Sequence, residues 1–392
     1  MRVLSIIHYP TFGGPHNRNA HIVPHLAADG IDLTVLLPAD AENAAARLRD
    51  RAVEVIQIPL GRLRGGRDVR ARVAPLIRFR GDVGRLRAVI KRGEFDIVLI
   101  NGLINPHGAV AASLENRPVV WQLLDTFPPV TLRAAMMPLV LSMANALMTS
   151  GIAVADAHPG AMRFGERLFS FFPGVDLDRF TASTEMRQGA RAELGFADSD
   201  EVVGNVSNLN PMKGHMIFVE AAAELRRRRP GVRFAILGAT YPQHADYARN
   251  VREFAAARGL EVGKDLVIRD PEDDVAGLAS AFDVFWLTSE PRSEGLSTVA
   301  GEAMALGVPV VAARVGALAE SVLDGETGYL VEPRDAAAFA QRTEELFEDS
   351  DLRVALGAAA RHRAEACYDP SAGAAQHSRA FHAALLHHGR EQ

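Results

Sequence analysis

Two glutamates stand eight residues apart in the segment EGLSTVAGEAMALGVPVV, residues 294–311. Glu294 precedes a stretch of good helix formers that runs from Thr298 to Leu306, and Glu302 lies inside it. Eight helical residues at about 100° each would leave about 80° between the two side chains, so we expect the carboxylates to have different roles. Carboxylates accept hydroxyl hydrogen bonds, and a helix N-terminus attracts an anion. This combination suits a ligand with hydroxyl groups at both ends and a phosphate between them, which describes a nucleotide sugar.

A second candidate segment is SNLNPMKGH, which follows an apolar run. Pro211 and Gly214 favour a turn, and Lys213 stands where the next helix is expected to begin. A lysine beside the free N–H groups of a helix start suits a diphosphate. A solvated lysine is the alternative, and the residues alone give the two interpretations equal weight.

A third segment, HYPTFGGPHNRN, follows the first apolar run of the chain. Gly13 and Gly14 allow a ligand to approach the backbone closely, and three polar residues stand beside them. These residues are His16, Asn17 and Arg18. A plain turn is the favoured alternative, because the full G-x-G-x-x-G pattern of a dinucleotide site is absent.

Nine short β-rich runs, separated by amphipathic or alanine-rich segments, must position these loops. They form two groups: residues 3–9, 32–38, 96–102 and 117–124, then 202–207, 233–239, 266–270, 283–289 and 309–315. Continuous apolar strands joined by helices predict parallel sheets that are buried on both faces. We therefore predict an α/β fold with two doubly wound, Rossmann-like domains, residues 1–178 and 179–370. Ligands of such sheets bind beyond the carboxyl ends of the strands, where the three segments lie.

Composition excludes several classes of protein. The chain of 392 residues has a net charge of −5, which gives no support for a nucleic-acid partner. A single cysteine cannot form an internal disulfide, and residues 1–9 predict a strand instead of a signal peptide. We expect a cytoplasmic protein.

Two further segments are compatible with more than one environment. Residues 134–148 carry no charge but contain Pro138, Ser142 and Asn145, which favours a buried or cleft-lining helix over membrane contact. Residues 62–92 contain eleven Lys or Arg and two Asp. This basic segment suits an anionic acceptor or an acidic membrane surface. We favour the alternative of a solvated, arginine-rich helix and loop.

The motifs occur in an order that resembles a known family. Residues 294–311 and the N-P-M-K-G-H segment, with D-G-E-T-G-Y-L-V-E-P at 324–333, resemble retaining glycosyltransferases of family 4, which have the GT-B fold. In the N-terminal half, only the glycine loop, the strand pattern and F-P-G-V-D-L-D-R-F at 172–180 support the resemblance. It implies that the two domains face each other across a cleft, and that the donor is bound mainly by the C-terminal domain and the acceptor by the N-terminal one. It also implies a final helix, within residues 371–392, that returns to the N-terminal domain.

The resemblance assigns roles to residues of the C-terminal half. Glu302 would hold the ribose hydroxyls, Glu294 would contact the transferred sugar, and Lys213 would neutralise the departing diphosphate. Backbone groups of four residues would bind sugar hydroxyls and phosphate: Gly295, Leu296, Ser297 and Thr298. This chemistry needs no cofactor and no metal. We predict none, because the acidic pair in PEDDVAG, residues 271–277, is not a D-x-D site.

The sequence departs from the family pattern at two positions. Many relatives carry an arginine where this chain has Asn208, so Arg18 or another cation would have to supply that charge. Relatives often carry a histidine where this chain has Leu124, and Asp125 is the nearest polar substitute. A helix-capping role for Asp125 has equal weight. Our predicted site adds Gly13, Gly14, Arg18 and Asn208 to the donor side, Asp125 to the catalytic residues, and His16 and Asn17 to the acceptor side.

The resemblance predicts a retaining transferase. It would move a hexose from a nucleoside-diphosphate sugar, with UDP as the first expectation from family frequency, to a small-molecule or lipid-linked acceptor. The alternative, suggested by Asn208 and Leu124, is a catalytically weak nucleotide-sugar-binding or partner protein on the same fold. A third class, a GT-B epimerase or phosphorylase, is expected to lack the E-x7-E arrangement. No motif specifies the sugar, the acceptor or the oligomeric state.

Overall fold

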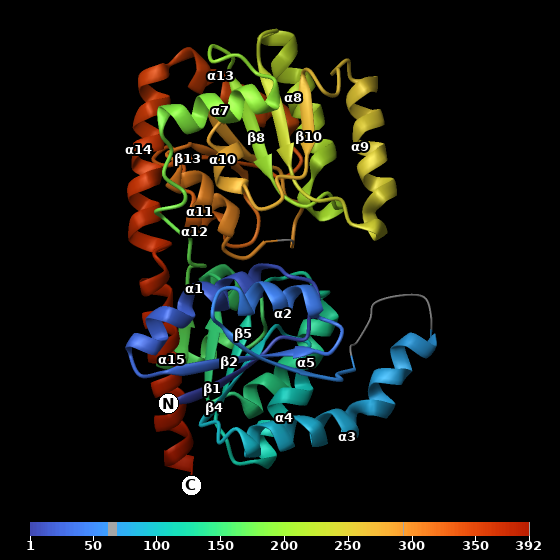
Figure 1. Ribbon diagram of the computed structural model, residues 1–392, viewed down its shortest axis with the longest axis vertical. Coiled ribbons are helices and arrows are strands. Elements are labelled where there is room, and N and C mark those ends of the chain that lie inside the picture. The colour runs from blue at the N-terminus through green and yellow to red at the C-terminus, as the bar shows by residue number, and fades with distance from the viewer. Residues whose placement is uncertain (62–68, 293, 392) are drawn as a thin grey trace. The chain divides into compact units, whose positions relative to one another are not determined.

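The computed structural model describes residues 1–61, 69–292 and 294–391, which form two α/β units (Figure 1). Unit 1 comprises Met1–Gly174 and Pro370–Gln392, and unit 2 comprises Val175–Asp369. The chain thus leaves unit 1 a few residues before position 178, and its last helix belongs to unit 1.

Unit 1 is built on a seven-stranded, fully parallel sheet with the order β3-β2-β1-β4-β5-β6-β7. Its strands are β1 (Arg2–Ile6), β2 (Asp32–Pro38), β3 (Glu54–Ile58), β4 (Ile97–Asn101), β5 (Val119–Leu123), β6 (Ala146–Thr149) and β7 (Leu168–Ser170). The four strands predicted for this half are confirmed, whereas β3, β6 and β7 were not predicted.

The helices of unit 1 connect these strands and cover both faces of the sheet. They are α1 (Gly14–Ala28), α2 (Glu42–Arg49), α3 (Val69–Arg92), α4 (Pro106–Leu114), α5 (Val130–Met143), α6 (Ile152–Asp156), the 3₁₀ helix η1 (Ala161–Arg167) and α15 (Pro370–Glu391). One apolar core joins α1, α2 and α15 to the sheet, and it includes Phe381 and Ala384 near the end of the chain. Right-handed crossovers place α3, α4 and α5 on the opposite face.

The interpretation of residues 134–148 as one buried or cleft-lining helix was wrong. Helix α5 ends at Met143, and Ala146–Thr149 form strand β6 in the centre of the core. Several residues on the outer side of α5 are exposed. Within the described residues, no helix is long and apolar enough to cross a membrane. Of the basic segment predicted at 62–92, residues 62–68 lie outside the described residues.

Unit 2 has a six-stranded parallel sheet with the order β10-β9-β8-β11-β12-β13. Its strands are β8 (Val202–Val206), β9 (Arg233–Leu237), β10 (Leu266–Arg269), β11 (Val284–Leu287), β12 (Val310–Ala313) and β13 (Gly328–Val331). All five strands predicted for this half are confirmed, and β13 was missed.

The helices of unit 2 cover its sheet in the same manner. They are α7 (Thr184–Leu194), η2 (Pro211–Lys213), α8 (His215–Arg228), η3 (Pro242–His244), α9 (Ala245–Ala257), α10 (Val275–Ala279), α11 (Thr298–Ala305), α12 (Leu318–Ser321), α13 (Ala336–Glu348) and α14 (Ser350–Cys367). The core is centred on Trp286 of β11, whose ring meets Phe218 and Phe339. Its indole Nε1 donates to Thr343 Oγ1 at 2.7 Å, so the buried N–H group is satisfied.

The strand order reverses direction once in each sheet. In unit 1 the reversal lies between β1 and β4, and in unit 2 it lies between β8 and β11. The loops after these paired strands run to opposite faces, which opens a crevice at the carboxyl end of the sheet. The loops after β1, β4, β8 and β11 are therefore the expected ligand-binding loops of the two units.

Candidate functional site

A lysine and a glutamate meet at the switch point of unit 2. Lys213 lies in the loop after β8, Glu294 lies in the loop after β11, and Lys213 Nζ is 2.6 Å from Glu294 Oε1. Ser289 Oγ donates to the same carboxylate oxygen at 2.7 Å. Only 6% of the Glu294 surface is exposed, whereas the Lys213 side chain is 27% exposed. The carboxylate is therefore held from two sides, while the ammonium group keeps an accessible side.

Local interactions fix the Lys213 loop against the β11 loop. Gly214 has a φ of +68°, and a Cβ on it would overlap the carbonyl oxygen of Thr288, so only glycine fits. Thr288 Oγ1 donates to the Lys213 carbonyl at 3.1 Å, and the Glu290 N–H donates to Met212 O at 2.9 Å. These bonds join residues far apart in the sequence, and they place the lysine beside Glu294.

A series of buried hydrogen bonds also stabilises the Lys213 loop. The Asn205 side chain donates to Trp286 O at 2.7 Å, and its oxygen accepts from Ser207 Oγ at 2.6 Å. Ser207 Oγ lies 3.0 Å from His215 Nε2, which therefore carries the proton and donates. Burial, followed by the nearby Lys213 charge, lowers the pKa of His215 to about 4. The imidazole is thus neutral near pH 7.

The segment after Glu294 forms the N-terminus of α11, as predicted. Ser297 is its N-cap, and its hydroxyl accepts from Ala300 N at 3.4 Å. Gly316, from the loop after β12, packs against the Glu294 carbonyl with a φ of +54°, and a Cβ there would overlap that oxygen. Gly295, Leu296 and Ser297 are buried in this arrangement, and Thr298 is the first helical residue.

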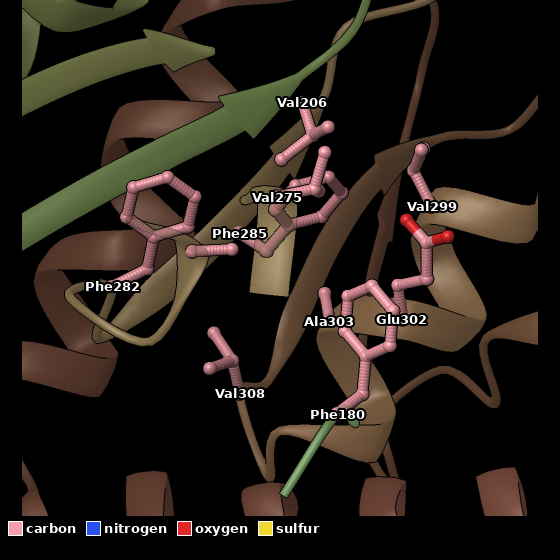
Figure 2. Close-up of a pocket in the computed structure, with 10 residues that line it drawn as sticks. Phe180, Val206, Val275, Phe282, Phe285, Val299, Glu302, Ala303 and Val308 are labelled. Atoms are coloured by element: carbon pink, nitrogen blue, oxygen red, sulfur yellow. The ribbon is translucent and has the colours of Figure 1, made fainter. Parts of the chain in front are cut away.

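Glu302 faces a different environment, a pocket on the side of α11 (Figure 2). It is the only ionisable residue among those that line the pocket: Phe180, Val206, Val275, Ala279, Phe282, Phe285, Val299, Ala303 and Val308 supply the rest. Burial raises the pKa of Glu302 to about 7, against a smaller opposing effect of the Arg179 charge. Arg179 itself donates to the carbonyl of Asp273. The Glu302 carboxylate is thus surrounded by apolar side chains that leave little free volume between them, and this burial places its pKa near neutrality.

The acidic pair near this pocket has a structural role. Asp274 caps α10 by accepting from Gly277 N at 3.0 Å. Across the described ranges of the chain, no group of three or more His, Cys, Asp or Glu residues is arranged to hold a metal ion.

In unit 1, His16 shapes the glycine loop. Its Nδ1 accepts from Gly13 N at 3.3 Å, so Nε2 carries the proton and donates to Tyr9 O at 3.2 Å. Burial is the main cause that lowers the pKa of His16 to about 4. Gly14 begins α1, and a Cβ on it would meet no atom within 4 Å. His16 thus holds the loop through both ring nitrogens, and the backbone at Gly14 leaves open space beside it.

Arg18 points into unit 1 instead of toward a ligand surface. It is 5% exposed, and its guanidinium donates to Asn101 Oδ1 at 2.6 Å and Gln122 Oε1 at 2.5 Å. Its carbon Cζ lies 4.9 Å from the centre of the Phe171 ring. Burial lowers the pKa of Arg18 to about 9. To reach a phosphate, the side chain would have to break both of these hydrogen bonds.

The remaining predicted residues of unit 1 are also engaged. Asn17 Oδ1 accepts from Arg51 at 2.6 Å. Asp125 Oδ1 accepts from Phe127 N at 3.0 Å, which is a turn contact two residues along the chain. The helix-capping role that had equal weight from the sequence is wrong, because the N-cap of α5 is Pro129. Asp125 also lies close enough to Tyr9 to contribute, after burial, to raising the pKa of Tyr9 to about 12.

Comparison with known proteins shows which proteins unit 2 is similar to. Residues 186–363 match the model of the family "Glycosyl transferases group 1", which is most of unit 2 and less than half of the chain. The D-inositol 3-phosphate glycosyltransferase of Corynebacterium urealyticum is 34% identical over 206 residues, 52% of this chain and 48% of the relative. The GDP-mannose-dependent alpha-(1-6)-phosphatidylinositol monomannoside mannosyltransferase of Mycolicibacterium smegmatis is 35% identical over 195 residues, 48% of this chain and 50% of the relative. The match spans about half the length of these curated relatives.

Solved structures resemble the chain over nearly its whole length. HepE of Anabaena in complex with UDP has a TM-score of 0.81 at 24% identity, and the alignment covers 96% of this chain and 98% of HepE. The sucrose-phosphate synthase of Thermosynechococcus elongatus has a TM-score of 0.76 at 20% identity, with 97% and 98% covered. The chain has the GT-B fold.

The GT-B fold and the predicted fold class therefore agree. Within unit 2 of this GT-B chain, Lys213, Glu294 and the start of α11 come together, and Glu302 lies on the side of the same helix. Asn208 is exposed in the Lys213 loop and brings no charge to it.

Sequence reasoning missed several residues of the candidate site. Ser289 binds Glu294, Gly316 packs on its carbonyl, and Arg179 and Phe180 lie beside Glu302. Ser289 and Gly316 could have been found, because Ser289 ends one predicted strand and Gly316 directly follows another, at the carboxyl ends where ligands bind. Arg179 and Phe180 belong to the linker between the predicted domains, where no strand or helix pattern indicates a site.

Proposed function

We propose that the chain is a glycosyltransferase that moves a hexose from a nucleoside-diphosphate sugar to an acceptor with retention of the anomeric configuration. The observation that carries this proposal is the Lys213–Glu294 pair, which joins two loops at the switch point of the unit matched by the glycosyltransferase family. A cation, a buried carboxylate and a helix N-terminus at one point suit the diphosphate and sugar of such a donor.

Each part of the donor has a proposed partner. The diphosphate would lie near Lys213 and the free N–H groups at the start of α11, and the hexose would hydrogen-bond to Glu294. The backbone of Gly295, Leu296, Ser297 and Thr298 would contribute to the same subsite. Glu302 would accept hydrogen bonds from the ribose hydroxyls. HepE, which shares the fold, has been solved with UDP and with UDP-glucose, and this supports UDP as the first donor to test.

In the proposed reaction, the acceptor oxygen forms a bond to the anomeric carbon on the face from which the diphosphate departs. The bond between that carbon and the phosphate oxygen breaks, its electron pair leaves with the diphosphate, and the acceptor proton passes to the departing oxygen. Lys213 would stabilise the charge that develops on the leaving group. Glu294 is a binding residue in this mechanism, and neither a metal ion nor another cofactor takes part.

We propose that unit 1 binds the acceptor beside the glycine loop. Gly13 and Gly14 leave the backbone accessible, Asn17 follows them in the first turn of α1, and Asp125 lies in the loop after β5. His16 would act indirectly, because both of its nitrogens hold the loop. The two relatives are named for an inositol phosphate and a phosphatidylinositol mannoside, which supports a small-molecule or lipid-linked acceptor. A single cysteine supports a cytoplasmic location.

Thermal unfolding with a panel of nucleotides tests the proposal. UDP, GDP, ADP and dTDP, each alone and as its hexose conjugate, are added to the full chain. We expect one nucleotide to raise the Tm of unit 2, because a ligand at a hundred times its Kd adds about 2.7 kcal/mol. The stabilising conjugate is then incubated with inositol phosphates, and the anomeric configuration of the product is read by NMR. Absence of any shift would contradict the donor site, and a shift without transfer would indicate a nucleotide-sugar-binding protein.

A further inference from the structure

Three helices cover one face of the sheet in unit 1. α3 packs against α4, and α4 packs against α5, so the three form one layer (Figure 1). A helix on the surface of a soluble domain normally turns charged and polar residues outward. This layer departs from that pattern in two ways.

The outer side of α5 carries no charge. Its only charged residue is Arg133, which is 5% exposed because it turns inward and donates to Pro128 O at 3.1 Å and to the carbonyl of Ala157. Val130 is 61% exposed and Leu132 is 37% exposed. The other exposed residues of α5 are small or uncharged: Thr131, Ala134, Ala135, Pro138 and Ser142. α5 thus presents to solvent a surface that would normally be covered.

The middle helix continues the uncharged surface. α4 contains no Asp, Glu, Lys or Arg, its His107 is buried, and Leu114 at its end is 56% exposed. α4 thus separates α5 from α3 without adding a charge, and Leu114 is its one exposed large apolar side chain.

The outer side of α3 is cationic. Over residues 79–92, where its side chains are described, every exposed charged residue is a base: Arg80, Arg85, Arg87, Lys91 and Arg92. The one acid in this stretch, Asp82, is buried and pairs with Arg85. We interpreted this helix from the sequence as solvated, but the uncharged surface of α4 and α5 beside it changes that interpretation.

We propose that the outer face of α3, α4 and α5 binds the surface of an anionic phospholipid bilayer. The exposed apolar residues of α5 and α4 would enter the membrane interface, and the cations of α3 would bind the anionic headgroups. Helices that lie on a membrane surface combine apolar and cationic residues in the same way. A second copy of the chain is a poorer partner. Asp82 pairs with Arg85 and Glu115, at the end of α4, pairs with Arg87, which leaves Arg80, Lys91 and Arg92 to meet a partner surface. The described side chains of these three helices include no exposed carboxylate, so a face-to-face pair of copies would bring these three cations together without counter-charges.

Vesicle co-sedimentation of the full chain tests this proposal. We expect the wild type to bind vesicles of phosphatidylcholine mixed with phosphatidylglycerol, and to bind phosphatidylcholine vesicles weakly. Arg80→Gln combined with Lys91→Gln is expected to weaken binding about 25-fold, because each cation near the surface contributes about 1 kcal/mol. Val130→Glu is expected to weaken binding because it places a charge at the interface.

Matched variants in unit 2 serve as controls. Val354 is 67% exposed on α14, and the Arg249 side chain is 62% exposed on α9. Val354→Glu and Arg249→Gln are expected to leave vesicle binding unchanged, and all variants should retain the wild-type Tm. Equal binding to both kinds of vesicle, or an equal loss in the control variants, would overturn the proposal. A solution dimer that Val130→Glu converts to a monomer would overturn it too, because a second copy would then cover this face.

Discussion

At the scale of single residues, the proposed donor site depends on the Lys213–Glu294 pair. Glu294 is almost fully buried and has two polar partners, Lys213 and Ser289, whereas Lys213 keeps one accessible side. An arriving diphosphate would compete with Glu294 for the ammonium group, and the freed carboxylate could then accept a sugar hydroxyl. The Lys213–Glu294 ion pair could therefore be replaced by bonds to the donor. We expect mutations of Lys213 and of Glu294 to affect activity differently.

Lys213→Ala is expected to lower kcat by about 10²–10³-fold, the range for loss of one group that stabilises a developing anion. It should also destabilise unit 2 by about 1–3 kcal/mol, because Glu294 stays buried without its cation. Steady-state kinetics and denaturant unfolding measure the two effects. The double variant Lys213→Ala/Glu294→Ala should recover part of the stability but none of the rate. A single variant with wild-type kcat would contradict the role of Lys213.

The raised pKa of Glu302 predicts that nucleotide binding depends on pH, if Glu302 binds the ribose as proposed. Its pKa is raised to about 7, so the neutral acid is favoured in the folded state below that pH. If the ionised form accepts the ribose hydroxyl bonds, nucleotide affinity should rise as the pH increases from 6 to 8. Calorimetric titration of the wild type and Glu302→Gln measures this dependence. The variant should bind more weakly at pH 8 and lose the pH dependence, whereas parallel profiles would assign the titration to another group.

At the scale of elements, glycines determine where loops can meet. Gly214→Ala should destabilise unit 2 by more than about 1 kcal/mol, because the residue has a positive φ and its Cβ would overlap the Thr288 carbonyl. It should also lower nucleotide affinity by displacing Lys213. Gly189→Ala is the matched control, since its Cβ would meet no atom within 4 Å and it lies inside α7. That change is expected to stabilise by about 0.5–1 kcal/mol. Denaturant unfolding compares the two, and equal effects would contradict the steric argument.

The sequence predicted the strands that have a clear apolar pattern and missed those that lack one. Nine strands were found because each is a continuous apolar run bounded by turn residues. β6 was missed because Ala146–Thr149 continue the uncharged run of α5, and no local signal separates a buried strand from a helix there. β3 is a short edge strand whose residues are only partly buried.

The candidate site was predictable to a similar extent. Lys213, Glu294 and α11 follow from motifs, and the structure brings the first two together. The position of Arg18 was not predictable, because its partners Asn101 and Gln122 come from strands more than 80 residues away. A polar residue beside a glycine loop can turn toward a ligand or into the domain, and only tertiary packing decides which.

At the scale of the whole molecule, buried histidines make the fold sensitive to acid. His16, His215 and His377 have no exposed surface, and burial is the main cause that lowers their pKa values to about 4, 4 and 3. His377 Nδ1 donates to Gly373 O at 2.7 Å, and Nε2 accepts from Gln122 at 2.9 Å, so the neutral ring is required. Gln122 in turn accepts from Arg18, which links helix α15 to the sheet.

The direction of the acid effect follows from these shifts. The unfolded chain binds protons on histidine near pH 6.5, and the folded chain does so only near pH 3–4. The histidine contribution to stability is therefore complete above about pH 6.5 and is lost as the pH falls toward 4. Denaturant unfolding between pH 4 and 8 should show this loss. His377→Gln should flatten the profile of unit 1, and His382→Gln, on the exposed side of α15, should leave it unchanged. An unaltered slope in His377→Gln would contradict the assignment.

Turnover and nucleotide binding of Glu294→Ala, measured on one preparation, test whether Glu294 binds the transferred sugar. Glu326→Ala, an exposed residue of the same unit, is the control and should behave as the wild type. We predict that Glu294→Ala binds the nucleotide identified by thermal unfolding but transfers no sugar from its conjugate, because the carboxylate contacts the hexose and not the nucleotide. Wild-type turnover in this variant would contradict the proposed site at the switch point of unit 2.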